Sequence, residues 1–330
     1  MRIALIGAGR IGRLHGALLA EQPGVDRLIV ADVDATHASD TATAIGGTTA
    51  ATPEQAMDGA DAVVIAASTT AHASLVRAAI DRNLPTFCEK PLAFDLAESV
   101  ELCDQIETAG AVVQVGFQRR FDHAYLEARR LVESGGLGTV YLVRLIANDH
   151  EPPPESYVPT SGGLFRDASI HDFDALRWLT GQEVVDVYAA GSVRGFPFFE
   201  TYGDIDTGAA ILTLADGTIG VLSQTRHDPR GYDVRMEIVG SRDAVTVGLG
   251  PRTPLRSLEA GAMEFRENGW DSFLTRFETA YREELITFLR VVRGEVSSPC
   301  TARDSLAAMR IAVAAGLSRT EHRPVRIADV

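Results

Sequence analysis

The chain has little positive charge, few cysteines and no long apolar run. Its 330 residues include 31 Lys and Arg against 45 Asp and Glu, a formal net charge of −14. Nucleic-acid phosphates need a basic stripe that this composition does not offer, and no apolar run approaches membrane-spanning length. The three cysteines, Cys88, Cys103 and Cys300, are too few and too widely spaced for a disulfide framework or a cysteine metal site. We therefore expect a reduced, cytoplasmic protein without metal that binds neither nucleic acid nor membrane.

A glycine-rich turn follows the first apolar run, at residues 3–6. Its glycines have the spacing GxGxxG, and a segment of helical composition comes next. A strand, a tight turn and a helix start place backbone N–H groups and the positive end of a helix against a pyrophosphate. The expected cofactor contacts in this turn are Gly7, Gly9, Arg10, Ile11 and Gly12.

Asp32 strengthens the prediction of a dinucleotide site. It ends the next apolar run, at residues 28–31, twenty residues beyond Gly12. A carboxylate there accepts hydrogen bonds from ribose hydroxyls and repels the 2′-phosphate of NADP. The residues up to His37 add a second acid and contain no Arg or Lys that could bind a 2′-phosphate, so the expected cofactor is NAD. Alone, the glycine turn would also fit an incidental loop or a protein-kinase glycine loop, but the other kinase signatures are absent from the sequence.

The first third of the chain alternates apolar runs with helical segments. Strands are expected at 3–6, 28–31, 62–66, 86–88 and 112–115, and helices at 14–21, 73–82 and 96–109. This alternation predicts a parallel Rossmann sheet, with ligands beyond the carboxyl ends of its strands. Ser68, Thr69 and His72 follow one of these strands and are candidate cofactor contacts. The alternative is a Ser or Thr that only caps the next helix.

The pattern changes near residue 121. A helix is expected at 124–133, strands at 140–147, 184–193, 208–214, 218–225 and 234–239, and helices at 272–292 and 305–317. Successive strands joined by turns such as Ala215-Asp216-Gly217 predict a mainly antiparallel sheet. The expected fold is α/β, with an NAD-binding Rossmann domain at 1–121 and an α+β domain with a large, mainly antiparallel sheet at 122–330.

Two segments carry candidate catalytic residues. Glu89 and Lys90 follow the strand at 86–88; Glu89 is a candidate cofactor contact, and Lys90 would steady an alkoxide with its fixed charge. Lysines are, however, most often solvated surface groups. Asp167 and His171 stand four residues apart, so on one helix the carboxylate would fix the imidazole tautomer and raise its basicity. The alternative is a helix cap and a core histidine, but oxidising an alcohol beside a nicotinamide requires a base.

On these motifs the chain resembles the glucose–fructose oxidoreductase/inositol dehydrogenase (Gfo/Idh/MocA) family, and especially its inositol dehydrogenase branch. The resemblance covers almost the whole chain and is carried by the glycine turn and by residues 88–92, 116–122, 161–167 and 170–178. It implies that Lys90, Asp167 and His171 form the catalytic set. It also implies a homo-oligomer, a tetramer, whose second domain binds substrate and forms the assembly.

The departures from the family pattern lie in the expected substrate region. Residues 148–151 read Asn-Asp-His-Glu where the family usually carries a basic residue and an Asp-Pro pair, and Ala-Ser at 168–169 replaces Met-Thr or Met-Ala. These changes leave the candidate catalytic residues in place, but they leave the identity of the substrate open. The candidate polyol contacts are Lys90, Arg120, His150, Tyr157 and His171. For Arg120, His150 and Tyr157 the alternative is a structural role.

The expected reaction is NAD-dependent oxidation of a secondary ring hydroxyl of a cyclitol, which by resemblance is myo-inositol to 2-keto-myo-inositol. One alternative is a dehydrogenase or reductase of a pyranose sugar, sugar acid or glycoside. Another is a non-catalytic regulator that senses NAD. The presence of Lys90, Asp167 and His171 favours an enzyme, because a sensor has no use for a base.

Overall fold

The computed structural model describes residues 1–261 and 268–330, which divide into two compact units. The first unit comprises Met1–Phe121 and Thr279–Ala307, and the second Asp122–Glu278 and Ala308–Val330. Sequence analysis placed everything after residue 121 in one continuous domain, whereas the structure returns Thr279–Ala307 to the first unit. Within the described ranges, no helix combines the length and the hydropathy required to cross a bilayer.

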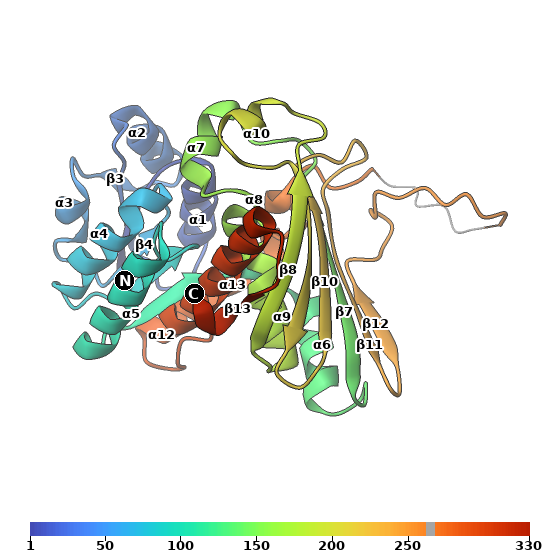
Figure 1. Ribbon diagram of the computed structural model, residues 1–330. Helices are drawn as coiled ribbons and strands as arrows, with labels where there is room; N and C mark the ends of the chain where they lie inside the picture. Colours follow the sequence, from blue (N-terminus) through green and yellow to red (C-terminus); the bar gives the residue numbers. More distant parts are fainter. Residues whose placement is uncertain (262–267) are drawn as a thin grey trace. The chain divides into compact units, whose positions relative to one another are not determined.

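The first unit is built on a six-stranded parallel sheet with the order β3-β2-β1-β4-β5-β6. Residues 1–121 of this unit are coloured from blue to teal in Figure 1. The strands are β1 (Arg2–Ile6), β2 (Arg27–Ala31), β3 (Thr48–Thr49), β4 (Ala62–Ile65), β5 (Thr86–Glu89) and β6 (Val113–Gly116). All four residues of β4 are buried, as expected for a parallel strand covered on both faces. The predicted Rossmann domain is confirmed.

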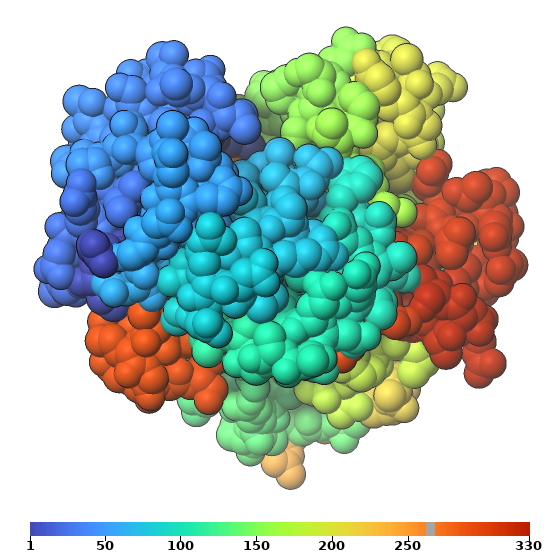
Figure 2. Space-filling view, turned by 90° about the vertical axis from the view of Figure 1, so that its left-hand side faces the viewer, coloured from blue at the N-terminus to red at the C-terminus, as the bar shows by residue number. Residues whose placement is uncertain are grey.

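Helices follow most of these strands. They are α1 (Arg10–Ala20), α2 (Ala35–Ala44), α3 (Pro53–Met57), α4 (Thr69–Ile80), α5 (Leu96–Ala109) and the 3-10 turn η1 (Gln118–Phe121). Helix α4 packs against both α3 and α5, and these three helices form one outer face of the unit (Figure 2). Asp34, Thr52 and Asp95 cap α2, α3 and α5 with side-chain oxygens, as short polar residues do at helix starts.

The late segment completes the first unit through α12 (Glu278–Val292). The Phe288 ring meets Phe87 of β5 edge-on at 5.8 Å between centroids. The amide of Gln114 on β6 donates to the Glu284 carbonyl oxygen at 3.1 Å. Apolar packing and a buried hydrogen bond therefore explain why this segment leaves the second unit.

The second unit contains a seven-stranded sheet with the order β12-β11-β7-β10-β9-β8-β13. The strands are β7 (Val140–Asn148), β8 (Val184–Ser192), β9 (Thr207–Leu214), β10 (Ile219–Thr225), β11 (Asp233–Gly240), β12 (Ala244–Val247) and β13 (Val325–Arg326). Only the pair β7 and β10 is parallel among the described strands of this sheet, so the predicted mainly antiparallel sheet is confirmed. The predicted hairpin turn joins β9 to β10, with Gly217 at φ +89°.

Helices pack on one face of this sheet. The helical elements are α6 (His123–Glu133), η2 (Glu155–Tyr157), α7 (Val158–Ser161), α8 (Leu164–Asp167), α9 (Ile170–Thr180), α10 (Phe198–Thr201), α11 (Phe273–Arg276), α13 (Ala302–Glu321) and η3 (Ile327–Asp329). Helix α9 lies so close to the sheet that a Cβ at Gly220 would stand 2.8 Å from Leu176. This contact holds the middle of α9 against the sheet, and the candidate base His171 lies in the first turn of the same helix.

One predicted helix is interrupted. Sequence analysis expected a single helix at 272–292, but α11 ends at Arg276 and α12 begins at Glu278. Phe277 between them leaves helical geometry at φ −113° and ψ +17° and buries its ring. The two helices belong to different units, so the break lies at the unit boundary.

Candidate active site

The glycine turn of the first unit has the shape that a dinucleotide phosphate requires. Gly7 has φ +98°, and a Cβ there would stand 2.5 Å from the Ala66 backbone; a Cβ at Gly12 would stand 2.0 Å from the Gly7 oxygen. At Gly9, by contrast, a Cβ would meet nothing within 4 Å. Arg10 and Ile11 open α1, and Gly9 gives its N-terminus no side-chain cap. The first N–H groups of α1 therefore suit an anionic ligand.

Asp32 directly follows β2 and lies against this turn. Its Oδ2 accepts from the Ala8 N–H at 2.6 Å and its Oδ1 from the Asp34 N–H at 2.8 Å. A carboxylate has about four acceptor positions, so these two bonds leave capacity for ribose hydroxyls. The turn, the helix start and the acid together fit NAD.

The segment after β4 departs in part from the expectation. Ser68 occupies the N-cap position of α4 but makes no capping bond with its side chain; its hydroxyl lies 3.3 Å from that of Thr70. His72 is 1% exposed, with Nδ1 2.7 Å from the Pro91 oxygen and Nε2 3.1 Å from the Ala67 oxygen. A neutral imidazole carries one N–H, so His72 donates to one of these two carbonyl oxygens. The buried ring braces the loops after β4 and β5 rather than reaching a ligand. Burial lowers the pKa of His72, and the two carbonyls only partly oppose this.

Glu89 and Lys90 lie at the end of β5, as expected. The Glu89 carboxylate is buried; Oε1 lies 2.7 Å from His15 Nε2 on α1, and Oε2 accepts from the Lys90 N–H at 3.2 Å. Glu89 therefore ties the backbone of Lys90 to the helix that follows the glycine turn. This places Lys90 and the dinucleotide turn in one rigid unit.

Arg120 does not fit its predicted role as a polyol contact. It is 5% exposed; Nη1 donates to the Pro299 oxygen at 2.8 Å and Nη2 pairs with Asp304 at 3.1 Å. Its partners belong to the late segment of the first unit, which the sequence did not place there. Arg120 therefore fastens that segment in place.

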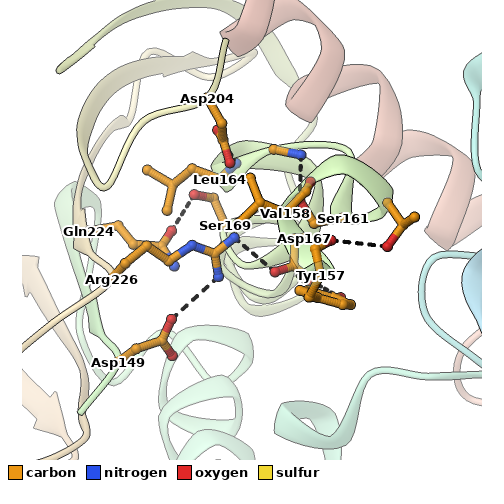
Figure 3. Close-up of polar contacts among 12 residues, drawn as sticks. Asp149, Tyr157, Val158, Ser161, Leu164, Asp167, Ser169, Asp204, Gln224 and Arg226 are labelled. Carbon is orange, nitrogen blue, oxygen red and sulfur yellow. Dashed lines mark hydrogen bonds and ion pairs between the residues drawn. The ribbon is translucent and has the colours of Figure 1, made fainter. Parts of the chain in front are cut away.

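In the second unit, Asp167 and His171 are not on one continuous helix. Helix α8 ends at Asp167 and α9 begins at Ile170, with Ala168 at φ −106° and ψ −51° between them. Ser169 makes a short hydrogen bond to the Gln224 side chain of β10, which holds the junction against the sheet (Figure 3). The expectation that one helix carries both residues is therefore wrong, although both residues flank the same short junction.

The Asp167 carboxylate is held from two sides (Figure 3). Tyr157 of η2 donates its hydroxyl proton to Oδ1 at 2.9 Å. Arg226, one residue beyond β10, donates from Nη2 to Oδ2 at 2.8 Å. Tyr157 was predicted as a polyol contact, and its 41% exposure leaves the ring edge open to a ligand.

Arg226 also binds a second carboxylate. Its Nη1 donates to Asp149 Oδ2 at 3.3 Å, and its side chain is almost fully buried. Burial disfavours the positive charge, but Asp167 and Asp149 outweigh it and hold the pKa of Arg226 above its ordinary value. Buried charges are tolerated when they are paired and hydrogen-bonded.

His150 follows Asp149 at the end of β7 and is half-buried. Its Nδ1 lies 3.0 Å from the Asp228 oxygen, and its own carbonyl oxygen lies 2.8 Å from His227 Nδ1. With Nδ1 as donor, Nε2 of His150 is left as the acceptor that could receive a ligand hydroxyl.

Sequence analysis missed Arg226 and Asp149. A signal was present in β10: Gly220, Leu222 and Gln224 face the core in alternation, and Arg226 continues the same side. Polar residues that extend an inward-facing alternation past a strand end are buried and need partners. Reading the alternation to its end would have found Arg226.

Comparison with known proteins places the chain in a family. Residues 1–117 match the model of the oxidoreductase family with an NAD-binding Rossmann fold, and residues 125–246 match the GFO/IDH/MocA C-terminal domain. The chain belongs to the Gfo/Idh/MocA oxidoreductase family.

Relatives span the whole chain. The myo-inositol dehydrogenase Hyg17 of Streptomyces leeuwenhoekii is 40% identical over 97% of this chain and 98% of its own length. The structure of a myo-inositol dehydrogenase from Corynebacterium glutamicum superimposes with a TM-score of 0.91 at 31% identity, covering 99% of this chain and 98% of that one. A scyllo-inositol dehydrogenase from Lactobacillus casei with bound NAD(H) and scyllo-inositol has a TM-score of 0.90 at 27% identity, covering 99% of both chains.

Proposed function

We propose that this protein is an NAD-dependent dehydrogenase that oxidises a secondary ring hydroxyl of a cyclitol, with myo-inositol as the first candidate and scyllo-inositol as the second. The observation that carries the proposal is the fixed Asp167 carboxylate beside the α8–α9 junction, together with a glycine turn and Asp32 that fit NAD. The relatives named as inositol dehydrogenases over the full chain length support the same substrate class.

The proposed catalytic roles belong to three residues. His171 takes the hydroxyl proton, and Lys90 binds the same oxygen and stabilises its developing negative charge. Asp167 balances the charge that His171 gains. Bound NAD supplies the acceptor for the hydride released from the ring carbon. In the reverse direction His171 returns the proton to the carbonyl oxygen.

The remaining site roles are also proposals. Gly7, Gly9, Gly12 and Asp32 bind NAD through backbone N–H groups and a carboxylate, with Arg10, Ile11, Ser68 and Thr69 along the same edge. His150 Nε2 and the Tyr157 ring contact the polyol ring. A ring rich in hydroxyls needs such polar contacts, because each unpaired buried polar group weakens binding.

Pyranose sugars are the alternative substrate class to the cyclitols. Residues 148–151 depart from the pattern that the resemblance led us to expect, at the point where His150 lies against the Asp228 backbone. A changed edge can admit a ring with a different hydroxyl pattern.

We also propose that the protein is a cytoplasmic homo-oligomer. Its three cysteines are buried as thiols, which suits a reducing compartment. The face of the seven-stranded sheet opposite the helices carries apolar side chains in one row, Tyr188, Ile211 and Val221, and a second copy of the chain would cover them.

The decisive experiment is a substrate panel. Purified protein is mixed with NAD and with myo-inositol, scyllo-inositol, glucose or a glucoside, and nicotinamide absorbance is followed. We expect the highest kcat/KM with a cyclitol. A higher kcat/KM with a pyranose would replace the proposed substrate. If NAD binds but no compound changes the nicotinamide absorbance, the result would favour a non-catalytic NAD sensor.

Variants of the catalytic set complete the test. Lys90→Ala and His171→Ala should each lower turnover by about a hundredfold or more, the usual loss when an electrostatic donor or general base is removed. The Kd for NAD should change little in His171→Ala, because His171 belongs to the second unit and the glycine turn to the first. Turnover near that of the parent protein in either variant would remove that residue from the set.

A further inference from the structure

Arg226 is a buried charge that the proposed proton transfer does not use. Its side chain binds Asp167 and Asp149, and its backbone N–H donates to the Asp206 oxygen at 2.7 Å. Asp206 in turn accepts the backbone N–H groups of Arg194, Gly195 and Phe196. The base of the Arg226 side chain is therefore as firmly anchored as its tip.

The guanidinium links carboxylates from different parts of the second unit. Asp149 follows β7 and Asp167 ends α8, and the carboxylate of Asp204 also acts on the Arg226 charge. Three negative groups around one positive group leave the cluster negative overall. Without the guanidinium, the two bound carboxylates would repel each other.

The same contact selects one orientation for Asp167. Arg226 holds Oδ2 and Tyr157 holds Oδ1, so the plane of the carboxylate is set by two donors from separate segments. An ammonium in place of the guanidinium would be a single point charge, without the planar fork that reaches both carboxylates at once.

We propose that Arg226 is a positioning residue for the dehydrogenation: it holds Asp167 ionised and in one orientation, with Asp149 as the second carboxylate that fixes the guanidinium. This inference rests on the proposed function, in which Asp167 serves His171. Arg226 itself touches neither substrate nor cofactor in this proposal and acts only through Asp167.

A double-mutant cycle tests that dependence. Arg226→Leu should lower turnover by about tenfold to a hundredfold, the scale of a displaced catalytic group, with the Kd for NAD unchanged. In the Asp167→Asn protein the same substitution should change turnover by less than about twofold, because the residue through which Arg226 acts is already altered. Arg226→Lys should recover part of the loss.

The pH profile supplies a readout that a merely structural role would not move in this way. In the proposed reaction the rate of oxidation rises with pH as His171 loses its proton, and we call this rise the pH limb. Arg226→Leu removes a positive charge from a cluster that contains Asp149, Asp167 and Asp204. The protonated form of His171 then becomes more favourable, so the pH limb should move to higher pH. Asp149→Asn removes a negative charge and should move the limb downward. Arg130→Leu, on α6 and paired with Glu127 at the surface, is the matched control and should leave the limb and turnover unchanged.

Any of three kinetic results would overturn the proposal. They are turnover and a pH profile near those of the parent in Arg226→Leu, an undiminished effect of Arg226→Leu in the Asp167→Asn background, or pH profiles that move in the same direction in both charge variants. If Arg226→Leu does not fold, Arg226→Lys and Asp149→Asn decide the question. Denaturant unfolding of the four proteins of the cycle needs no substrate. Additive unfolding effects would refute the positioning of Asp167, and strong non-additivity would support it even if the parent oxidised no polyol and the proposed function failed.

Discussion

At the scale of single residues, cofactor choice depends on Asp32. Its carboxylate is held by the N–H groups of Ala8 and Asp34, so it cannot swing away from a ligand without losing both bonds. Asp32→Ala should weaken NAD binding and reduce the preference for NAD over NADP, because the charge that repels a 2′-phosphate is gone. We expect about a tenfold rise in the Kd for NAD, the loss of charge-assisted hydrogen bonds worth about 1.5 kcal/mol.

Titration calorimetry with both nucleotides measures this change. Asp34→Ala is the control, since Asp34 caps α2 through the N–H groups of Thr36 and His37 and should alter stability more than cofactor choice. Equal affinity of the parent protein for NAD and NADP would show that the charge argument is wrong.

Also at this scale, buried polar residues explain where residue-level prediction failed. Arg120 and His72 have side chains typical of ligand contacts. In the structure, however, both lie buried against backbone carbonyl oxygens, and Arg120 also pairs with Asp304. Sequence alone does not show which carbonyl oxygens lack partners. The carbonyl oxygens of Pro91 and Pro299 come from segments 19 and 179 residues away in the chain.

At the scale of elements, the glycine turn offers a matched pair of substitutions. A Cβ at Gly12 would lie 2.0 Å from the Gly7 oxygen, whereas a Cβ at Gly9 would meet no protein atom within 4 Å. Gly12→Ala should therefore lower the thermal unfolding midpoint and NAD affinity together. Gly9→Ala, whose φ of −71° suits any residue, should keep the midpoint and weaken only NAD binding, because the new methyl group points toward the ligand.

Differential scanning fluorimetry without and with NAD separates the two outcomes. We expect the stabilisation by NAD to shrink in Gly9→Ala while the midpoint of the free protein stays within about 1 °C of the parent, since exposed substitutions usually change stability by less than about 0.5 kcal/mol. An unchanged response to NAD in Gly9→Ala would mean that the pyrophosphate does not approach this turn.

Elements that carry their own run of apolar residues were predicted well, and two-residue strands were not. The strands at 3–6, 86–88 and 234–239 match β1, β5 and β11 within two residues at each end. By contrast, β3 and β13 have two residues each and form only by pairing with neighbouring strands. No local sequence pattern therefore predicts them. The sequence did not predict the helix break at Phe277 for a similar reason. The break lies where the chain passes from one unit to the other, whereas the helical composition continues across it.

The candidate site shows the same division. Lys90, Asp167 and His171 could be proposed as site residues because they lie in distinctive local motifs. The contacts that fix them, His15 to Glu89 and Arg226 to Asp167, span 74 and 59 residues. Such contacts depend on the register of strands and helices, which the sequence does not display directly.

At the scale of the whole molecule, the seven-stranded sheet presents two different faces. One row across its inner face, Val187, Leu212, Gly220, Val143 and Ile238, belongs to the helix-covered side. The adjacent outer row contains Tyr188 and Ile211, which are 42% and 51% exposed, followed by Val221 and the Arg144–Glu237 ion pair. Apolar side chains that are flanked by a polar edge are typical of a protein interface.

Ile211→Arg tests whether this face joins copies of the chain. A buried, unpaired guanidinium at the centre of the row would cost about 3 kcal/mol, so association should weaken by roughly a hundredfold or more. Sedimentation equilibrium over a range of protein concentrations should show an oligomer for the parent and a smaller species for the variant, with NAD affinity retained because the glycine turn belongs to the other unit. Leu126→Arg on α6, with a similar exposure of 46%, is the control and should keep the parent mass. A parent protein that sediments as a monomer would end the oligomer proposal, whereas an oligomeric Ile211→Arg protein would move the interface to another surface.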